Sequence, residues 1–404
     1  MKVLALSYLF PNPAHPEYGI FVYNRLKALQ EFCEVKVIAP LQRYPFRGIL
    51  RPELNRSRKI DLNENMGGIE VWYPEFSVIP RHLKFIDAFS YYAAIKPLVK
   101  KIFKEGFTFD VIDTHWTYPD ILSAYFLSKR YNKPFIVTVR GKEALYLSDR
   151  GGRKLILDWC LRRASAVVAL SSELADLVVD VGVERHKVRV ILNGVDTGSF
   201  HQLDKIEARN KLSLPLDKKL LVAVGRLTEA KGHQNIIQAL PSLAFQHDVE
   251  LHIIGGINPE SDYSLNLKEQ VAKLGLHNVF IHNGMPHDQL LYWYNAADLF
   301  CLASHGEGCP NVVLEAMACG TPVVVSNVGA INDIVCDQSH GIIVDKSDVF
   351  VKSIQLALTK NWDRQAIAER MKKMSWQGCA KQVIELYNEV VANSGLLARN
   401  ETIL

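Results

Sequence analysis

Short apolar segments alternate with segments of helical periodicity along most of this 404-residue chain. In the first half we predict helices at Phe21–Glu31 and Ile121–Arg130. The predicted strands of this half are Val3–Ser7, Glu34–Ile38, Val111–Asp113, Phe135–Val139, Ala166–Leu170 and Val188–Ile191. Alternation of strands with helices is typical of a parallel sheet that helices cover on both faces. The chain therefore belongs to the α/β class.

The second half repeats this pattern. Its predicted strands are Leu220–Val224, Glu250–Ile254, Val279–His282, Leu299–Leu302, Val323–Ser326 and Gly341–Val344. Its predicted helices are Gln234–Phe245, Leu265–Leu274, His287–Asn295 and Val312–Cys319. We therefore expect two doubly wound, Rossmann-like domains, each with its ligand loops at the carboxyl ends of the strands.

The length of the chain also indicates more than one domain. We predict an N-terminal domain at residues 1–195 and a second domain at 196–375, with the linker around Val195–Lys219. Gln365–Ser394 is again helical in pattern. No stretch approaches the roughly 20 apolar residues of a membrane span. Met1–Ser7 runs into Pro11 and is interpreted as a buried strand, not as a signal peptide.

Two carboxylates bracket the segment from Glu307 to Glu315, and an apolar strand follows. Pro310 suits the first turn of a helix, and Gly320 suits the position just past its end. The N–H groups near Asn311 and Val312 would then form an anion site at the start of that helix. An anion site between two carboxylates suits a ligand with both phosphates and hydroxyls, such as a nucleotide-sugar.

Three motifs in this sequence resemble those of the family 4 retaining glycosyltransferases, which have the two-domain GT-B fold. Glu307 to Glu315 resembles the Glu-x7-Glu signature of that family. Gly225-Arg226-Leu227-Thr228-Glu229-Ala230-Lys231-Gly232 resembles its G-R-L-x-x-x-K-G element, and Asn193-Gly194-Val195-Asp196 its N-G-V-D. The resemblance implies two Rossmann-like domains that face each other across a cleft. It also implies that a helix at about 376–404 packs back on the N-terminal domain.

Glycosyl transfer from a nucleotide-sugar leaves a diphosphate that gathers negative charge, which a metal or fixed cations must neutralise. The chain contains no Asp-x-Asp, the usual metal-holding element of the other large glycosyltransferase fold. We therefore expect no metal and no cofactor, with Arg226 and Lys231 as the fixed cations. The alternative for both is a surface cation on an ordinary loop.

The resemblance assigns roles to the donor side of the site. Glu315 is expected to hold the ribose hydroxyls, and Glu307 to contact the donor sugar or to stabilise positive charge on its ring. The loops with Gly255-Gly256 and Asn283-Gly284, which follow predicted strands, are expected to line the base pocket. Gly225 is also expected to lie in the donor site. Gly19, which precedes a predicted helix, either lets backbone N–H groups approach the diphosphate or forms a plain helix entry.

The N-terminal domain is expected to hold the acceptor. His115 follows a predicted strand, and the resemblance places it at the donor sugar or the reacting centre, although a lone histidine is usually structural. Trp116 is either a packing residue or a platform for an acceptor sugar. Arg140 and Glu143 occupy the place of the family's T-x-H-G-x-D, and Arg140 either binds an acidic acceptor or forms an internal ion pair.

Charge is distributed unevenly along the chain. Residues 1–104 contain sixteen Lys/Arg and nine Asp/Glu, a net charge of +7, so the remaining 300 residues carry −3. This basic density is too low to predict nucleic-acid binding. Basic residues interleaved with aromatic ones at 41–60 and 81–107 instead suit the surface of an anionic membrane, the alternative being a solvated helix face. The seven cysteines contain no C-x-x-C pair, which indicates reduced thiols in the cytosol.

The sequence thus predicts a cytoplasmic, metal-independent, retaining glycosyltransferase of the hexosyltransferase class, with a place on the inner face of the cytoplasmic membrane. Its donor is expected to be a nucleoside-diphosphate sugar, most simply a UDP-sugar. Its acceptor is expected to be a glycan or lipid-linked glycan of cell-surface polysaccharide synthesis. Two alternatives stay open at this point, a nucleotide-sugar epimerase on the same fold and a non-catalytic nucleotide-sugar-binding partner of a polysaccharide assembly complex.

Overall fold

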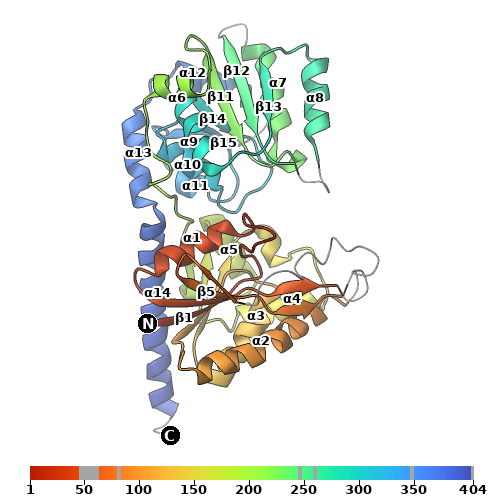
Figure 1. The fold of residues 1–404 in the computed structure, drawn as a ribbon, viewed down its shortest axis with the longest axis vertical. Coiled ribbons are helices and arrows are strands. Elements are labelled where there is room, and N and C mark those ends of the chain that lie inside the picture. Colours follow the sequence, from red (N-terminus) through yellow and green to blue (C-terminus); the bar gives the residue numbers. More distant parts are fainter. Residues whose placement is uncertain (45–62, 80–82, 244–247, 258–261, 346–349, 402–404) are drawn as a thin grey trace. The chain divides into compact units, whose positions relative to one another are not determined.

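The computed structural model describes residues 1–404 apart from 45–62, 80–82, 244–247, 258–261, 346–349 and 402–404 (Figure 1). The chain forms two compact units, Met1–Asn193 with Trp376–Leu404, and Gly194–Ser375. The residues expected to form a linker, 195–219, lie in the second unit and contain helix α6 (Lys205–Lys211). Within the described residues, no helix is long and apolar enough to cross a bilayer.

The first unit is built on an eight-stranded sheet in the order β10-β9-β8-β7-β1-β2-β5-β4. Its strands are β1 (Lys2–Leu6), β2 (Glu34–Ile38), β4 (Asn63–Met66), β5 (Ile69–Trp72), β7 (Val111–Thr114), β8 (Phe135–Val139), β9 (Ala166–Ala169) and β10 (Val188–Val190). All neighbours run parallel except β4 and β5, which run antiparallel. Two short strands, β3 (Leu41–Arg43) and β6 (Glu75–Ser77), pair with each other in a separate small sheet.

Alternate residues of these strands pack on helices of opposite faces. Four helices share a core with Leu4, Leu6 and Val137, namely α2 (Ile86–Lys104), α3 (Asp120–Tyr131), α4 (Gly152–Leu161) and α5 (Ser172–Asp180). Val3 and Ala5 belong to a second core with α1 (Ile20–Leu29) and the long C-terminal helix α14 (Trp376–Glu401), which lies beside α1 in Figure 1. The last helix therefore completes the hydrophobic core of the first unit.

The second unit has a six-stranded sheet in the order β13-β12-β11-β14-β15-β16, with every pair parallel. Its strands are β11 (Lys219–Val224), β12 (Val249–Ile254), β13 (Val279–His282), β14 (Leu299–Leu302), β15 (Val323–Ser326) and β16 (Gly341–Val344). Leu221, Ala223 and Ile253 face a core with helices α7 (His233–Leu243), α8 (Ser264–Lys273) and α12 (Phe350–Thr359).

Helices α9 (His287–Ala296) and α10 (Asn311–Ala318) pack on the other face of this sheet, where the rings of Tyr294 and Phe300 lie 5.7 Å apart. Helix α6 packs on α9, and α13 (Arg364–Lys373) packs on α10. The short helix α11 (Ile331–Ile334) precedes β16.

In both sheets the first strand lies in the interior, and the chain proceeds from it first to one side and then to the other. β1 lies between β2 and β7, and β11 lies between β12 and β14. At such a topological switch point the loops that follow two adjacent strands diverge, and ligands of doubly wound folds bind there. In the second unit these two loops are residues 225–232 and 303–310, which contain the predicted catalytic cations and Glu307.

Candidate active site

The loops that follow β11 and β14 pack directly on each other at the switch point of the second unit. The N–H of His305 donates to the carbonyl oxygen of Ala230 at 2.9 Å. Gly232 has a φ of +68°, and a Cβ at this position would lie 1.8 Å from the carbonyl oxygen of Ala303. Only glycine allows this approach without strain. The two loops are therefore held in one arrangement by backbone contacts.

Two of the predicted catalytic residues meet across these loops. Nζ of Lys231 lies 2.6 Å from Oε1 of Glu307, and the hydroxyl of Ser304 donates to the same oxygen at 2.7 Å. The side chains of Lys231 and Glu307 are 22% and 12% exposed. Partial burial reduces solvent screening, so this ion pair is stronger than one on the open surface.

Arg226, unlike Lys231, has an exposed side chain without an ion-pair partner among the described residues. It follows the carboxyl end of β11, and it is exposed. Its carbonyl oxygen accepts the N–H of Thr228 at 2.8 Å, but its guanidinium has no hydrogen-bond or ion-pair partner among the described residues. An Arg fork that is not committed within the protein can bind two oxygens of a phosphate.

Helix α10 begins at this same edge of the sheet. Asn311 and Val312 form its first turn and are half-buried, while Gly320, with a φ of +72°, follows its end. The N–H groups of a first helical turn have no partner within the helix, and they carry the positive end of the helix dipole. The start of α10 therefore offers an anion site beside the Arg226 and Glu307 loops.

Glu315 lies on the fifth residue of α10 and is only 7% exposed. Its Oε2 accepts a hydrogen bond from the hydroxyl of Tyr294 at 2.8 Å. Burial raises the pKa of the Glu315 carboxyl above its ordinary value, against the opposing effects of His287 and Tyr294. Sequence analysis did not identify Tyr294. An aromatic residue in a predicted helix gives no sign that its hydroxyl will hydrogen-bond to a carboxylate on another helix.

The predicted glycines of the donor side lie in neighbouring loops of the second unit. A Cβ on Gly255 would lie 1.9 Å from the carbonyl oxygen of Gly225, so these two loops touch. A Cβ on Gly284 would lie 3.2 Å from the Cα and from the N of Gly256. Sequence analysis missed His233, whose Nε2 lies 3.3 Å from the carbonyl oxygen of Gly225. Burial lowers the pKa of His233 to about 4.

His115 belongs to the first unit, where the structure places it in the interior with 0% exposure. Its Nε2 lies 2.9 Å from Oδ2 of Asp113, and its Nδ1 lies 2.9 Å from Nη2 of Arg140. Burial lowers the pKa of His115, so the ring is neutral at neutral pH, with the proton on the nitrogen that faces Asp113. Its part at the reacting centre stays a prediction.

Arg140 is held by three protein groups, and it is 5% exposed. Besides the His115 ring, its Nε donates to the carbonyl oxygen of His115 at 2.9 Å and its Nη1 to Oδ1 of Asn193 at 3.2 Å. These contacts are internal hydrogen bonds, and the binding of an acidic acceptor by Arg140 stays a prediction. The hydroxyl of Tyr387 on α14 donates to Asp113, which extends this buried network to the C-terminal helix.

Three further predicted residues lie in the first unit. Gly19 precedes α1 with a φ of +71°, and a Cβ there would lie 2.5 Å from the carbonyl oxygen of Leu9. Trp116 is half-buried and packs against the core of the α2–α5 face. Glu143 lies in a short 3₁₀ helix, Lys142–Leu145, and its side chain is outside the described residues.

A buried carboxyl that the sequence did not reveal begins α3. Asp120 is fully buried, and its Oδ2 accepts the N–H of Tyr8 at 2.9 Å. Its Oδ1 has no hydrogen-bond partner among the described residues, although the hydroxyl of Tyr91 lies nearby. Burial raises the pKa of Asp120 to about 7.

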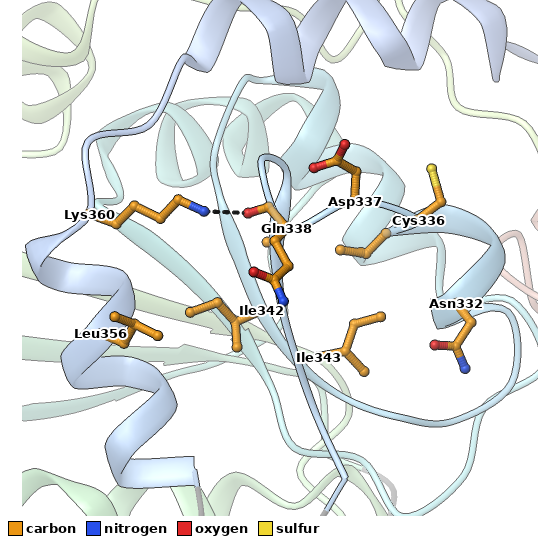
Figure 2. Close-up of a pocket in the computed structure, with 10 residues that line it drawn as sticks. Asn332, Cys336, Asp337, Gln338, Ile342, Ile343, Leu356 and Lys360 are labelled. Atoms are coloured by element: carbon orange, nitrogen blue, oxygen red, sulfur yellow. Dashed lines mark hydrogen bonds between the residues drawn. The ribbon is translucent and has the colours of Figure 1, made fainter.

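A pocket of about 500 Å³ lies at the far edge of the second sheet, beside β16 and α12 (Figure 2). Ile342, Ile343 and Leu356 line it together with polar groups, and Nζ of Lys360 donates to the carbonyl oxygen of Gln338 at 2.5 Å. None of the predicted site residues lines this pocket. In the described part of the chain, no three His, Cys, Asp or Glu side chains gather as metal ligands.

Two family models match consecutive parts of the chain and together cover most of it. The family described as Glycosyltransferase Family 4 matches residues 19–199, and the family described as Glycosyl transferases group 1 matches residues 204–374. The chain belongs to these glycosyltransferases. Among curated relatives, the teichuronic acid biosynthesis glycosyltransferase TuaC of Bacillus subtilis is 28% identical over 356 residues, which cover 86% of each chain.

Solved structures share this fold. Sucrose-phosphate synthase from Thermosynechococcus elongatus matches with a TM-score of 0.76 at 20% identity, over 97% of this chain and 100% of that one. HepE from Anabaena, in complex with UDP, matches with a TM-score of 0.68 at 20% identity, over 96% and 100%. At this identity the likeness establishes the fold, which is GT-B, as the sequence motifs predicted.

Proposed function

We propose that the chain is a metal-independent, retaining glycosyltransferase that uses a UDP-sugar to build a cell-surface polysaccharide. One observation carries the proposal. At the switch point of the second unit, Arg226, Lys231 and Glu307 gather beside the start of α10. Two cations and a helix start suit a diphosphate, and Glu307 suits the hydroxyls or the developing positive charge of a sugar.

The donor and the acceptor are proposed from relatives. HepE was crystallised with UDP, with UDP and glucose, and with UDP-glucose, which supports a UDP-sugar for this chain. TuaC is named for teichuronic acid biosynthesis, which supports a glycan or a lipid-linked glycan as the acceptor. In the proposed reaction the bond between the anomeric carbon and the β-phosphate oxygen breaks, and a bond to the acceptor oxygen forms on the same face.

The chain's own residues have defined tasks in this reaction. Arg226 and Lys231 stabilise the negative charge that the leaving UDP gathers, with the N–H groups of the first turn of α10. The proton of the acceptor hydroxyl passes to the leaving phosphate oxygen, so no carboxylate nucleophile is required. Lys231 must exchange Glu307 for phosphate when the donor binds, and this exchange frees Glu307 for the sugar.

A membrane surface is proposed for the first unit. On α2, Phe89, Ala93, Lys96, Lys100 and Lys104 are all exposed, and their spacing places them along one side of the helix. An exposed aromatic ring with a row of lysines suits an anionic bilayer. Of the segments expected to dock, residues 45–60 and 81–82 lie outside the described residues.

Calorimetry with UDP, GDP and ADP, followed by assays with the matching sugar nucleotides, tests the proposal. We expect UDP to bind selectively, and sugar transfer to a bacterial membrane extract to continue in EDTA with retention at the anomeric carbon. Loss of transfer in EDTA with recovery in Mn²⁺ would contradict the metal-independent mechanism. Epimerised donor without transfer would indicate a nucleotide-sugar epimerase instead.

A further inference from the structure

A row of four polar side chains crosses one face of the second sheet and ends at the last residue of β13. Nζ of Lys218 lies 2.8 Å from Oε1 of Glu250, and Oε2 of Glu250 lies 3.4 Å from Nε2 of His252. Nδ1 of His252 lies 3.1 Å from Nε2 of His282. The two imidazole rings are nearly parallel, with centroids 5.4 Å apart. None of these residues belongs to the motifs that identified the family.

Both histidines are packed so that neither ring can rotate freely. His252 stacks on Phe280 with centroids 4.8 Å apart, and it is buried. Trp293 of α9 lies against both imidazoles, with centroid distances of 5.0 Å to His252 and 4.9 Å to His282. The distances along the row therefore reflect a fixed arrangement of rings.

The hydrogen atoms of this row can be assigned by elimination. Burial lowers the pKa of His252 to about 4 and also lowers the pKa of His282, so both rings are neutral at neutral pH and carry one N–H each. Oε2 of Glu250 contacts Nε2 of His252 at 3.4 Å without hydrogen-bond geometry, and Nε2 has no other partner among the described residues. The negative charge of Glu250 therefore favours the proton of His252 on Nε2 by electrostatic attraction. Its Nδ1 must then accept, and the proton of His282 lies on the Nε2 that faces it.

This assignment leaves Nδ1 of His282 as a bare hydrogen-bond acceptor. His282 is half-buried, and this nitrogen has no hydrogen-bond partner among the described residues. The residue ends β13, at the carboxyl edge where doubly wound sheets bind ligands. Glycines lie in the loops beside it, since Gly255 and Gly256 follow β12 and Gly284 follows His282 by two residues. A Cβ on Gly256 would meet nothing within 4 Å, so there is open space here.

The distance between the proposed diphosphate site and the end of β13 also suits a nucleoside. Two strand spacings separate β11, which precedes Arg226, from β13. Adjacent strands lie about 4.8 Å apart, so the end of β13 lies roughly 10 Å from the switch point. A nucleoside spans about this length, which brings its base to the glycine loops when its diphosphate lies at Arg226 and α10.

From this geometry we infer that His282 reads an N–H group of the donor's base, and that Glu250 and His252 are positioning residues that keep its Nδ1 free of a proton. The inference rests on the proposed function, because it concerns the nucleotide of the same site. The imide N3–H of uracil is a donor of the required kind. A base edge that presents only acceptors to Nδ1 would be rejected, because two lone pairs would face each other.

Calorimetry with UDP and with N3-methyl-UDP, on the wild type and on His282→Phe, tests the reading of the base. Phenylalanine keeps a ring between His252 and Trp293 and removes the acceptor. We expect UDP to bind about tenfold more weakly to His282→Phe, the effect of one lost hydrogen bond. N3-methylation should weaken binding to the wild type more than to the variant, because the variant has no hydrogen bond left to lose. His277→Phe, at an exposed residue two positions before β13, should bind UDP like the wild type.

Glu250→Gln tests the relay. A glutamine amide can donate as well as accept, so His252 can carry its proton on Nδ1 and His282 can then present an N–H to the ligand. We expect weaker UDP binding and a smaller difference between UDP and N3-methyl-UDP, with the thermal midpoint of the variant as a check on folding. A residue that only supports the fold would not change the ratio between the two ligands.

The outcomes separate the inference from the function on which it rests. If the wild type does not bind UDP, the proposed donor is wrong and the inference is overturned with it. If the wild type binds UDP, but N3-methylation weakens binding equally in the wild type and in His282→Phe, only the inference is overturned. An unchanged ligand ratio in Glu250→Gln would remove the positioning role of Glu250 alone.

Discussion

Nζ of Lys231 lies 2.6 Å from Oε1 of Glu307, although 76 positions separate the two residues in the sequence. The contact exists because β11 and β14 are adjacent in the sheet, so their carboxyl-end loops meet. The cation expected to bind phosphate thus pairs with the carboxylate expected to bind the sugar. This contact fixes the positions of both side chains beside the start of α10.

Lys231→Ala should weaken UDP binding, because one charged hydrogen bond to the diphosphate is lost and Glu307 is left as an unpaired negative charge beside it. We expect a loss of about 2–3 kcal/mol, roughly 30- to 150-fold in affinity. Calorimetry with UDP measures this change. Lys268→Ala, an exposed lysine on α8, is the matched control and should bind UDP like the wild type. Equal affinity of Lys231→Ala and Lys268→Ala would remove Lys231 from the donor site.

Gly232→Ala should disrupt the packing of the two site loops. The added Cβ would lie 1.8 Å from the carbonyl oxygen of Ala303, so the β11–α7 loop must move away from the β14–α10 loop. We expect a lower thermal midpoint and loss of most UDP affinity, both measurable by thermal shift with and without UDP.

Gly275→Ala separates the clash at Gly232 from backbone strain. Gly275 has a similar φ of +62°, but a Cβ there would meet nothing within 4 Å. Its substitution should cost about 1 kcal/mol of stability from strain alone and leave UDP affinity unchanged. If both variants lose UDP affinity equally, the close approach of the loops does not matter for the site.

Much of the fold follows from apolar runs in the sequence. Phe135–Val139 and Leu299–Leu302 are strands in the structure with the predicted bounds, because a short apolar run that is buried on both faces of a sheet is the clearest strand pattern. The strand Asn63–Met66 was missed because it is polar and lies at an edge, where burial does not require apolar residues. One long helical prediction, Gln365–Ser394, is two helices that Met374 and Ser375 separate.

The site was predictable only in part. Motifs identified Arg226, Lys231 and Glu307, since each lies in a loop at a strand end. The burial of His115 was not predictable, because it depends on Asp113 and Arg140 closing around the ring from two different strands. The pair of His252 and His282 left a weaker signal, a polar residue in each of two apolar strands. Its meaning depends on the register of β12 and β13.

Asp120 should make the stability of the first unit depend on pH. Burial raises its pKa to about 7 from an ordinary value of 3.8, so the folded chain holds a proton that the unfolded chain has released. The stabilising effect is therefore complete below pH 4 and is lost as the pH rises towards 7 and above. The loss between pH 4 and pH 8 is on the order of 4 kcal/mol.

Asp120→Asn isolates this effect, because an amide oxygen can still accept the Tyr8 N–H and no proton is exchanged. Urea unfolding between pH 4 and pH 8 should show the variant gaining stability relative to the wild type as the pH rises. Glu105→Gln, on an exposed end of α2, should show no such trend. A constant difference between Asp120→Asn and the wild type at all pH values would contradict the raised pKa.

Lys96, Lys100 and Lys104 should decide whether the first unit binds a membrane. All three are exposed on the side of α2 that also carries Phe89, whose side chain is 46% exposed. Each lysine close to an anionic surface contributes about 1 kcal/mol, so replacing all three by glutamine should weaken binding about 100-fold. Flotation with vesicles of phosphatidylglycerol and phosphatidylcholine measures this.

Charge and apolar contact can be separated in the same assay. Phe89→Ala should weaken binding at both low and high salt, whereas the loss caused by the lysine substitutions should shrink as salt screens the surface. Substitution of Lys211, Lys268 and Lys273 by glutamine removes three exposed lysines of the second unit and is the matched control. If this control weakens flotation as much as the α2 substitutions, the attraction is a property of overall charge, and α2 is not a docking surface.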